Sequence, residues 1–493
     1  MFKVGTGGEI HHSHQKEHKQ IYPQQGWVEH DPEEIYKNCV DCIENCIEHL
    51  DEPSQLKGFG ITNQRETTLV WDKNTGKPLH NAIVWLDTRT QSVCNEFSDR
   101  NAFKYICGLP VSTYFSGMKL KWMIDNVPAV KSALDEGTGL FGTIDSWLLW
   151  KLTGGPDGGV HATDVTNASR TMLMNIHTGQ WDKDMCEVLG VPMSCLPEIR
   201  SSCETYGHYK SKGPREFSMP ICSILGDQQA ALVGQGCFKE GQSKNTYGTG
   251  CFFMSNVGEK PVFSKNGLLT TVGYKAGPNK PMCYALEGSV AVAGACVQWL
   301  RDNLQIIEGA PEVELYASEV EDTGGMYFVP AFSGLFAPHW REDARGAMVG
   351  MTMYTNKRHV CRAAIEAICY QVSDVIDAAE ADSGIRITKL KVDGGAAANN
   401  LMMQFQSDLL EVEVVRPKML EITALGVEFF AGLSLGIYKD FNELLEIADN
   451  AGRNFHPTMT EEVRKVKKTG WNKAIEKSLG WVDDETKAKA EEL

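Results

Sequence analysis

The sequence predicts an α/β protein with two similar domains around a cleft. The chain has 493 residues, which is enough for two large domains. In each half, hairpin-like strands come first, and strands that alternate with helices follow. The composition turns polar around Lys239–Lys244. We therefore place the first domain at residues 1–238 and the second at residues 239–493, which ends in a charged tail.

The composition favours a soluble globular protein. Hydrophobic residues make up 42% of the chain and charged residues 23%. The net charge of -16, without a basic patch, argues against nucleic acid and anionic membranes as partners. Residues 1–20 lack the apolar core of a signal peptide, and the most apolar stretch, Thr423–Tyr438, is short and contains Glu428. No transmembrane helix is expected, and the location expected is the cytoplasm.

The cysteines and the early histidines suggest a metal site only weakly. Cys39, Cys42 and Cys46 share one face of a predicted helix, but no fourth ligand of suitable spacing is evident. The fifteen scattered cysteines are typical of reduced thiols packed as small core residues. The sequence therefore names no metal ligand.

In the first half, turn and cap residues mark the expected elements. Gly5–Gly8 predicts a turn, and the polar residues after it resemble the second half of a hairpin. Asp31 and Pro32 are expected to open a helix that runs to about Leu50. Strands are expected near residues 58–63, 69–71 and 81–85, and a helix capped by Asp145 or Ser146 after them.

The stretch from Ile221 to Leu232 is the centre of the predicted site. An apolar run leads to Gly226, the polar residues Asp227, Gln228 and Gln229 follow, and a helix begins there. This pattern predicts a buried strand that ends in a polar turn at the mouth of the cleft. From this stretch alone, Asp227 is either the cap of the helix or an acid placed to take a proton from a bound hydroxyl.

The second half contains two candidate phosphate sites. Residues 245–253 predict a hairpin with Gly248-Thr249-Gly250 at its turn. The strand Lys389–Asp393, the turn Gly394–Asn400 and a helix from Leu401 form the arrangement that presents backbone N–H groups to phosphates. The alternatives are an ordinary turn in the first case and an Asn helix cap in the second. A helix over residues 288–300 would place Gly294 and Gln298 on one face.

Long motifs in this chain resemble the FGGY family of carbohydrate kinases. Two of them, Tyr114–Asn126 and Gly346–Glu366, are long enough to be specific. Shorter matches bring the chain close to the members that act on glycerol. They are Gly26–Glu29, Ile61–Thr67, Thr166–Arg170, Gly226–Gln229 and Val392–Gly395. The resemblance covers residues 19–481.

The resemblance implies two actin-like (ribonuclease H-like) ATPase domains that close on ATP and glycerol. It implies transfer of the γ-phosphoryl group of ATP to glycerol, with Mg²⁺, as the first step of glycerol catabolism, and a homo-oligomer. Asp227 matches the catalytic base. The glycerol-binding positions matched are Arg65, Glu66, Trp85, Tyr114, Asp227, Gln228 and Phe252. The nucleotide-binding positions matched are Thr249, Gly294, Gln298, Gly395 and Asn399.

One departure from the family pattern affects the expected activity. FGGY kinases begin with a strand and a hairpin of the Asp-Gln-Gly-Thr type, which contacts the ATP phosphates and whose Asp serves the Mg²⁺ site. Gly5 and Thr6 lack the preceding strand and Asp, so we expect this hairpin to be missing and a strand edge to be unpaired. The chain is then a shortened form or a form with impaired catalysis.

The sequence is compatible with three functions. The first is an active kinase for glycerol, and the second is a catalytically weak protein that binds glycerol or a partner. The third is a kinase for another polyol or sugar, against which Gln64–Thr67 argues.

Overall fold

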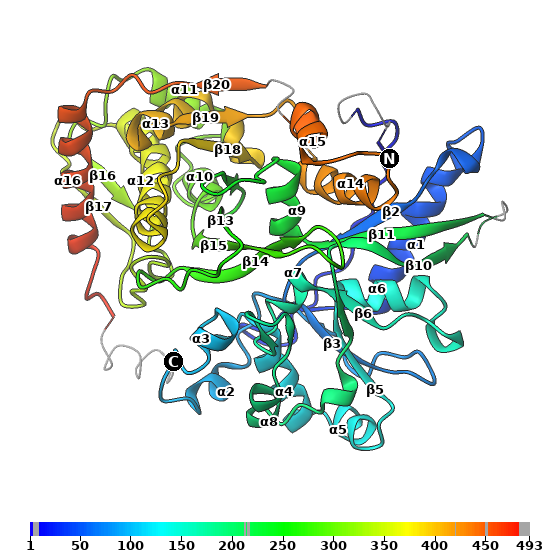
Figure 1. Ribbon diagram of the computed structural model, residues 1–493. Helices are drawn as coiled ribbons and strands as arrows, with labels where there is room; N and C mark the ends of the chain where they lie inside the picture. The colour runs from blue at the N-terminus through cyan, green and yellow to red at the C-terminus, as the bar shows by residue number, and fades with distance from the viewer. Residues whose placement is uncertain (3–8, 212, 214–216, 420, 449–451, 483–493) are drawn as a thin grey trace.

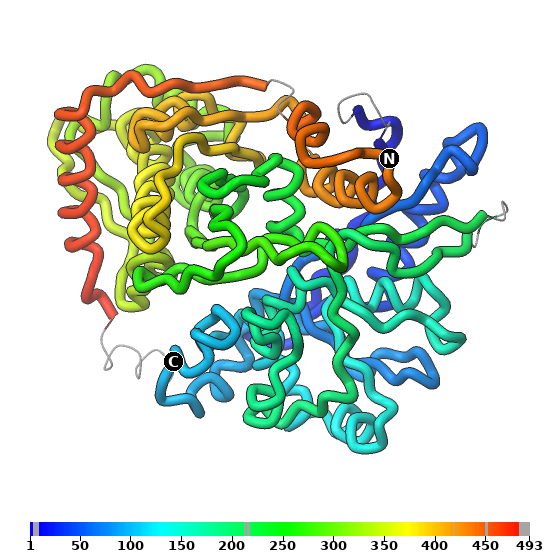
Figure 2. The backbone as a smooth tube through the Cα atoms, viewed as in Figure 1, coloured from blue at the N-terminus to red at the C-terminus, as the bar shows by residue number. Residues whose placement is uncertain are grey.

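The two halves of the chain form two lobes in the computed structural model (Figure 1). The structure describes residues 1–2, 9–211, 213, 217–419, 421–448 and 452–482. Gly5 and Thr6, on which the hairpin expectation depends, lie outside the described residues, as does the tail beyond Val482. Figure 2 shows the red C-terminal helix on the outer side of the second lobe, far from the blue N-terminal segments.

The first lobe contains a four-stranded sheet, β1-β4-β3-β5, and a three-stranded sheet, β10-β11-β2. Its elements are β1 (Glu29–His30), α1 (Pro32–Glu48), β2 (Phe59–Asn63), β3 (Thr68–Asp72), β4 (Ala82–Ile83), α2 (Gln91–Asn95), α3 (Lys104–Cys107), α4 (Ser116–Asn126), α5 (Pro128–Asp135), β5 (Gly139–Thr143), α6 (Ile144–Leu152), β6 (Ala162–Asp164), α7 (Val165–Ala168), β7 (Met174–Asn175), β8 (Gln180–Trp181), α8 (Lys183–Val188), β9 (Glu198–Arg200), β10 (Cys203–Lys210), β11 (Ser218–Gly226) and α9 (Asp227–Gly234).

The second lobe is built on a seven-stranded sheet of order β14-β15-β13-β12-β18-β19-β20. Its parallel strands β12, β18 and β19 lie in the middle, and antiparallel strands extend it on both sides. Its elements are β12 (Ser243–Tyr247), β13 (Cys251–Gly258), β14 (Leu269–Lys275), β15 (Met282–Val290), α10 (Gly294–Asp302), α11 (Ala310–Ser318), β16 (Tyr327–Val329), β17 (Ala347–Val349), α12 (Lys357–Ser383), β18 (Lys389–Asp393), the 3₁₀ helix η4 (Gly395–Ala398), α13 (Asn400–Leu410), β19 (Glu413–Arg416), α14 (Ile422–Ser434), α15 (Phe441–Ala448), β20 (Arg453–Phe455) and α16 (Glu461–Lys477).

Several predicted elements are confirmed. The Asp31 side chain accepts from Glu33 N and caps α1, with Pro32 at its first position. The apolar run before Asp227 is the buried strand β11, and α9 follows it directly. The predicted hairpin over residues 245–253 is β12 paired with β13.

Two local predictions were wrong. The helix expected from Gly288 begins only at Gly294, because residues 288–290 complete β15 through its pairing with β13. Neither Asp145 nor Ser146 caps α6, whose N-cap is Thr143. The Asp145 carboxylate instead accepts from the hydroxyls of Thr143 and Thr163, because both lie beside it in the buried interior.

Strand β2 is an outer strand among the described residues, since β11 is its only ladder partner there. Helix α14 packs across β2 and β11 although it comes late in the chain. At Gly60, an added Cβ would lie 3.0 Å from Val427 O. The glycine therefore lets α14 approach the sheet closely.

Helices α9 and α14 cross in contact between the two lobes (Figure 1). A Cβ added at Gly426 would lie 1.9 Å from Ala230 O, and one at Gly234 would lie 2.1 Å from Ile422 O. Real side-chain carbons do not approach an oxygen so closely. The crossing therefore requires glycine at both positions, and it fixes the helix whose first residue is Asp227.

We expect Gly426→Ala to destabilise the protein. In an uncrowded helix position this change would stabilise by about 1 kcal/mol, whereas here the added carbon forces α14 off α9 at a cost of about 1–3 kcal/mol or more. Urea unfolding measures the difference. Ser434→Ala on the same helix is the control, with an expected change within about 0.5 kcal/mol. A Gly426→Ala protein as stable as wild type would contradict the role of this crossing.

Candidate active site

Arg65 and Asp227 lie together because two parallel strands end at the same edge of one sheet. Strand β2 pairs with β11 in a register that places Asn63 opposite Gly226. Each strand is followed by a polar residue that turns toward the other, and Arg65 Nε lies 3.2 Å from Asp227 Oδ1. The pattern around Asp227 predicted the strand, the turn and the helix, whereas the contact with Arg65 comes from the pairing of β11 with β2.

Glu287, on β15 of the second lobe, is the main residue that sequence reasoning missed. The guanidinium of Arg65 donates to both of its oxygens, at 2.6 and 2.8 Å. Both side chains are buried, and the fork geometry makes this a strong pair. Burial alone would raise the pKa of Glu287, but Arg170 and Arg65 together lower it to about 2. No motif around Glu287 could have indicated this pairing.

Glu66 is buried in the same cluster. Its Oε1 accepts from Arg170 Nε at 2.6 Å, and its side chain is 1% exposed. Its backbone has a φ of 59°, which is uncommon for a residue other than glycine. The hydroxyls of Thr68 and Ser116 donate to its carbonyl oxygen and hold this conformation. Burial raises the pKa of Glu66, and Arg65 and Arg170 oppose that rise.

Asp227 differs from the other carboxylates of the cluster in its accessibility. Its side chain is 37% exposed, compared with 1% for Glu66 and 0% for Glu287. The N-cap of α9 is Gly226, and no side chain caps this helix. The Asp227 carboxylate accepts from the backbone N–H of Gln228 at 2.8 Å and from the Nε2 of the same residue at 3.5 Å. The interpretation of Asp227 as a helix cap is therefore wrong, because Gly226 occupies the cap position, and the carboxylate stays accessible.

Three aromatic side chains gather next to these charges. Trp85 packs edge-on against Tyr114 and Phe252, with ring centroids 5.6 and 6.3 Å apart. The Arg170 guanidinium lies over the Tyr114 ring at 5.5 Å. Trp85 and Tyr114 come from the first lobe and Phe252 from β13 of the second, so the group spans the boundary between the lobes. All three are partly exposed, unlike core aromatics.

The predicted nucleotide positions meet at one edge of the large sheet. Strands β12 and β18 run parallel, so the turns that follow them lie next to each other. A Cβ on Gly394 would lie 2.5 Å from Tyr247 O, which shows how close these turns are. The N–H of Gly294, at the start of α10, donates to Gly248 O at 2.9 Å. Thr249, Gln298 and Gly395 are exposed.

Asn399 has a structural role as well. Its Oδ1 accepts from Met402 N at 2.8 Å and caps α13, as the alternative interpretation of this turn expected. The turn before it is nevertheless open, because a Cβ at Gly395 would meet nothing within 4 Å. Backbone N–H groups at such a helix start can receive a phosphate.

A lysine of the second lobe contacts the Gln228 side chain. Its Oε1 accepts from the ammonium of Lys244, a buried residue of β12 that the sequence interpretation did not select. Its Nε2 lies 3.5 Å from Asp227 Oδ2. The amide therefore stands between Lys244 and Asp227.

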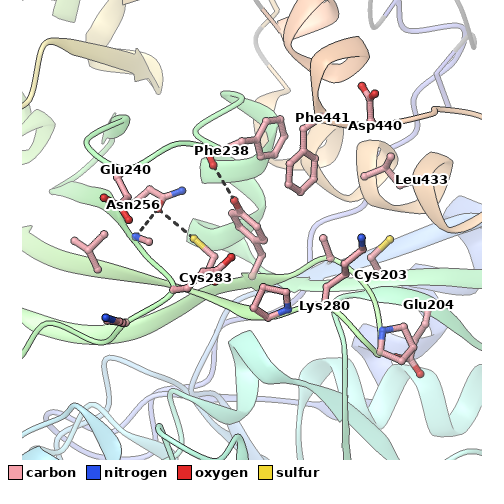
Figure 3. Close-up of a pocket in the computed structure, with 18 of the residues that line it drawn as sticks. Cys203, Glu204, Phe238, Glu240, Asn256, Lys280, Cys283, Leu433, Asp440 and Phe441 are labelled. Carbon is pink, nitrogen blue, oxygen red and sulfur yellow. Dashed lines mark hydrogen bonds between the residues drawn. The ribbon is translucent and has the colours of Figure 1, made fainter.

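A large cavity of about 1370 Å³ lies elsewhere and holds none of the predicted site residues. Figure 3 shows Phe238 beside Phe441 on one side of it and Asn256 beside Cys283 on another. The rings of Phe238 and Phe441 stack at 4.3 Å. Across the described ranges, no group of three His, Cys, Asp or Glu side chains could hold a metal ion, and this includes Cys39, Cys42 and Cys46. Within these ranges, no helix is long and apolar enough to span a membrane.

Comparisons with known proteins agree with these observations. The model of the N-terminal domain of the FGGY family of carbohydrate kinases matches residues 4–234, and that of the C-terminal domain matches residues 243–435. A glycerol kinase from Paenarthrobacter aurescens is 53% identical over 97% of this chain and 95% of its own length. One from Brucella anthropi is 52% identical with the same coverage. The crystal structure of Plasmodium falciparum glycerol kinase with ADP has a TM-score of 0.91, with 42% identity over 96% of this chain and 94% of that one.

We expect Glu287 to make stability depend on pH. Because its pKa in the folded protein, about 2, lies below the ordinary 4.5, its contribution is full above pH 4.5 and disappears as the pH falls toward 2. Glu287→Gln should lower the free energy of unfolding at neutral pH by about 3–5 kcal/mol, because two arginines stay buried.

Urea unfolding of both proteins from neutral pH downward measures this effect. The difference in unfolding free energy between wild type and Glu287→Gln should shrink below pH 4.5. The exposed Glu48→Gln is the control and should differ little from wild type at any pH. A constant difference across the range would contradict the ion-pair account.

Proposed function

Because the chain belongs to the FGGY family of carbohydrate kinases, we propose that it is a glycerol kinase. It would transfer the γ-phosphoryl group of ATP to glycerol and release sn-glycerol 3-phosphate and ADP, the first step of glycerol catabolism. Relatives with this name share half of the sequence over nearly the whole chain. The observation that carries the proposal is the accessibility of Asp227, the one exposed carboxylate of an otherwise buried ion cluster.

Polar pairing and aromatic walls would give the site its specificity. Glycerol offers three hydroxyls and little apolar surface, so recognition has to come from paired donors and acceptors. Asp227 supplies an acceptor and the Gln228 amide a donor, and the buried Arg65 guanidinium holds the Asp227 carboxylate through its Nε. Trp85, Tyr114 and Phe252 would cover the carbon backbone. Glu66 would act mainly by holding Arg170, since its own side chain is buried.

Asp227 would act as the base. Phosphoryl transfer depends on positioning and charge stabilisation more than on covalent chemistry. The accessible carboxylate of Asp227 would accept a hydrogen bond from the attacking hydroxyl, align it, and take its proton as the bond to phosphorus forms. The Arg65 guanidinium would keep the carboxylate oriented through the 3.2 Å contact.

Backbone donors would hold the ATP phosphates from the second lobe. Backbone N–H groups come together at one sheet edge in the turns at Thr249 and Gly395. Gly294 packs against the Thr249 turn through its hydrogen bond to Gly248 O. Asn399 and Gln298 would contact the nucleotide beside them. Mg²⁺ commonly takes one or two carboxylates together with substrate phosphates. Asp227, the exposed carboxylate of the cluster, and Asp393, at the end of β18 before the Gly395 turn, are the residues that would hold it. When bound, the ion would neutralise phosphate charge.

A coupled ADP-release assay tests the function. The chain is assayed with ATP and glycerol, xylulose or gluconate, and turnover with glycerol alone is expected. Turnover with one of the other substrates would replace the proposal by another polyol or sugar kinase. Glycerol binding by calorimetry without turnover would identify a binding protein.

The homo-oligomer and the cytoplasmic location stay predictions, and gel filtration and cell fractionation would test them.

We expect Asp227→Asn to cut turnover by about 10²–10⁴-fold, the usual contribution of a general base. Glycerol affinity should be largely retained, because an amide can still accept a hydrogen bond at that oxygen. Steady-state rates and glycerol calorimetry measure the two effects. Asp125→Asn, on the surface of α4, is the control and should keep the wild-type rate. Full turnover by Asp227→Asn would exclude Asp227 as the base.

A further inference from the structure

Lys244 is a fully buried cation whose ammonium contacts only uncharged oxygens. Its Nζ donates to Gln228 Oε1, to Thr246 Oγ1 at 3.0 Å and to Phe252 O at 3.2 Å. Within the described ranges, no carboxylate lies at ion-pair distance from it, whereas Arg65 and Arg170 each contact carboxylates directly. Burying a charge is costly unless it is paired and hydrogen-bonded, and here only the three accepting oxygens offset that cost.

The ammonium determines which way the Gln228 amide faces. An ammonium group has three donors and no acceptor, so the amide atom beside it must be the oxygen. The amide nitrogen then faces the opposite way, toward Asp227 Oδ2 at 3.5 Å. Without Lys244, the two ends of the amide could exchange places and would present an acceptor where a donor now stands.

The other two contacts of Lys244 fix its own position. Thr246 is two residues farther along the same strand, and Phe252 belongs to the partner strand of the hairpin. Phe252 is also one of the aromatic walls, and β12 leads directly into the turn that contains Thr249. Lys244 therefore connects the wall and the phosphate-side hairpin of the second lobe to a side chain of the first lobe.

We propose that Lys244 is a positioning residue that holds the Gln228 amide with its nitrogen toward the substrate hydroxyl beside Asp227. The proposal rests on the proposed function, because it assigns the substrate to that place. With this orientation, Gln228 donates to a hydroxyl oxygen while Asp227 accepts from a hydroxyl hydrogen. The pair then recognises vicinal alcohol groups in one arrangement, and it does so only when the two lobes are in contact.

A double-mutant cycle between Lys244 and Gln228 tests this role. Lys244→Met keeps the length of the side chain and removes the charge, and Gln228→Met removes the amide. Lys244→Met should raise the KM for glycerol and its calorimetric Kd about tenfold or more, as expected for loss of a charged hydrogen bond. The KM for ATP should change less than the KM for glycerol. In the Gln228→Met background, Lys244→Met should have almost no further effect on glycerol.

Lys391 provides a matched control. It lies opposite Lys244 in the β12–β18 register, is buried, and donates to Gln235 O at 2.6 Å. Lys391→Met removes a comparable charge from the neighbouring strand and should leave both KM values unchanged. Lys244→Arg keeps a donor and should recover most of the glycerol affinity. Thermal unfolding shows whether Lys244→Met is folded. If it is not, Lys244→Arg takes its place as the test variant.

Three results would overturn the proposal. One is an equal effect of Lys244→Met with and without the Gln228 amide. Another is a rise confined to the KM for ATP, which would make Lys244 a phosphate contact. The third is a glycerol KM for Lys244→Arg that matches the Gln228→Met level. If the wild type binds glycerol without turnover, the same double-mutant cycle is measured with calorimetric Kd values in place of KM values, and the same results would overturn the proposal. A wild type that does not bind glycerol would overturn the proposed function and this inference together.

Discussion

The buried pairing of Arg65 with Glu287 joins the two lobes at the point where the candidate chemistry lies. Arg65 follows a strand of the first lobe, and Glu287 belongs to a strand of the second. Their two hydrogen bonds satisfy charges that would otherwise be costly to bury. Arg170 contributes to the same cluster from the other side, and with it the positive and negative charges are nearly balanced. The relative position of the lobes at the site is therefore set by electrostatics as well as by packing.

This pairing explains why Asp227 stays accessible. The charge of Arg65 is already satisfied by Glu287, so Asp227 contacts it only through Nε. The parallel register of β2 and β11 brings the two residues together, and the crossing of α9 with α14 holds the helix that begins at Asp227. An accessible carboxylate on a rigid support suits a base that has to align a hydroxyl before it takes the proton.

The second lobe contributes to both sides of the expected reaction. Strand β12 carries Lys244, which holds Gln228, and it ends in the turn that is expected to receive phosphates. Phe252, on the next strand, completes the aromatic group with Trp85. A displacement of this hairpin would alter substrate orientation and phosphate contact at the same time. The candidate site thus depends on contact between the two lobes.

The sequence alone determined the local elements and the residue types of the site. Asp31 with Pro32 predicted a helix start, the apolar run before Asp227 predicted a buried strand, and family motifs indicated Arg65, Trp85 and Phe252, because these signals lie in short stretches of chain. The end of β15 at Val290 and the Thr143 cap were missed, since strand pairing and buried hydroxyls outweighed local preferences there. Only the tertiary structure identified Glu287 and Lys244. Arg65, which forks onto Glu287, is 222 residues away in the sequence, and Gln228, which Lys244 contacts, lies in the other lobe. No local pattern records which side chains meet when two lobes come together.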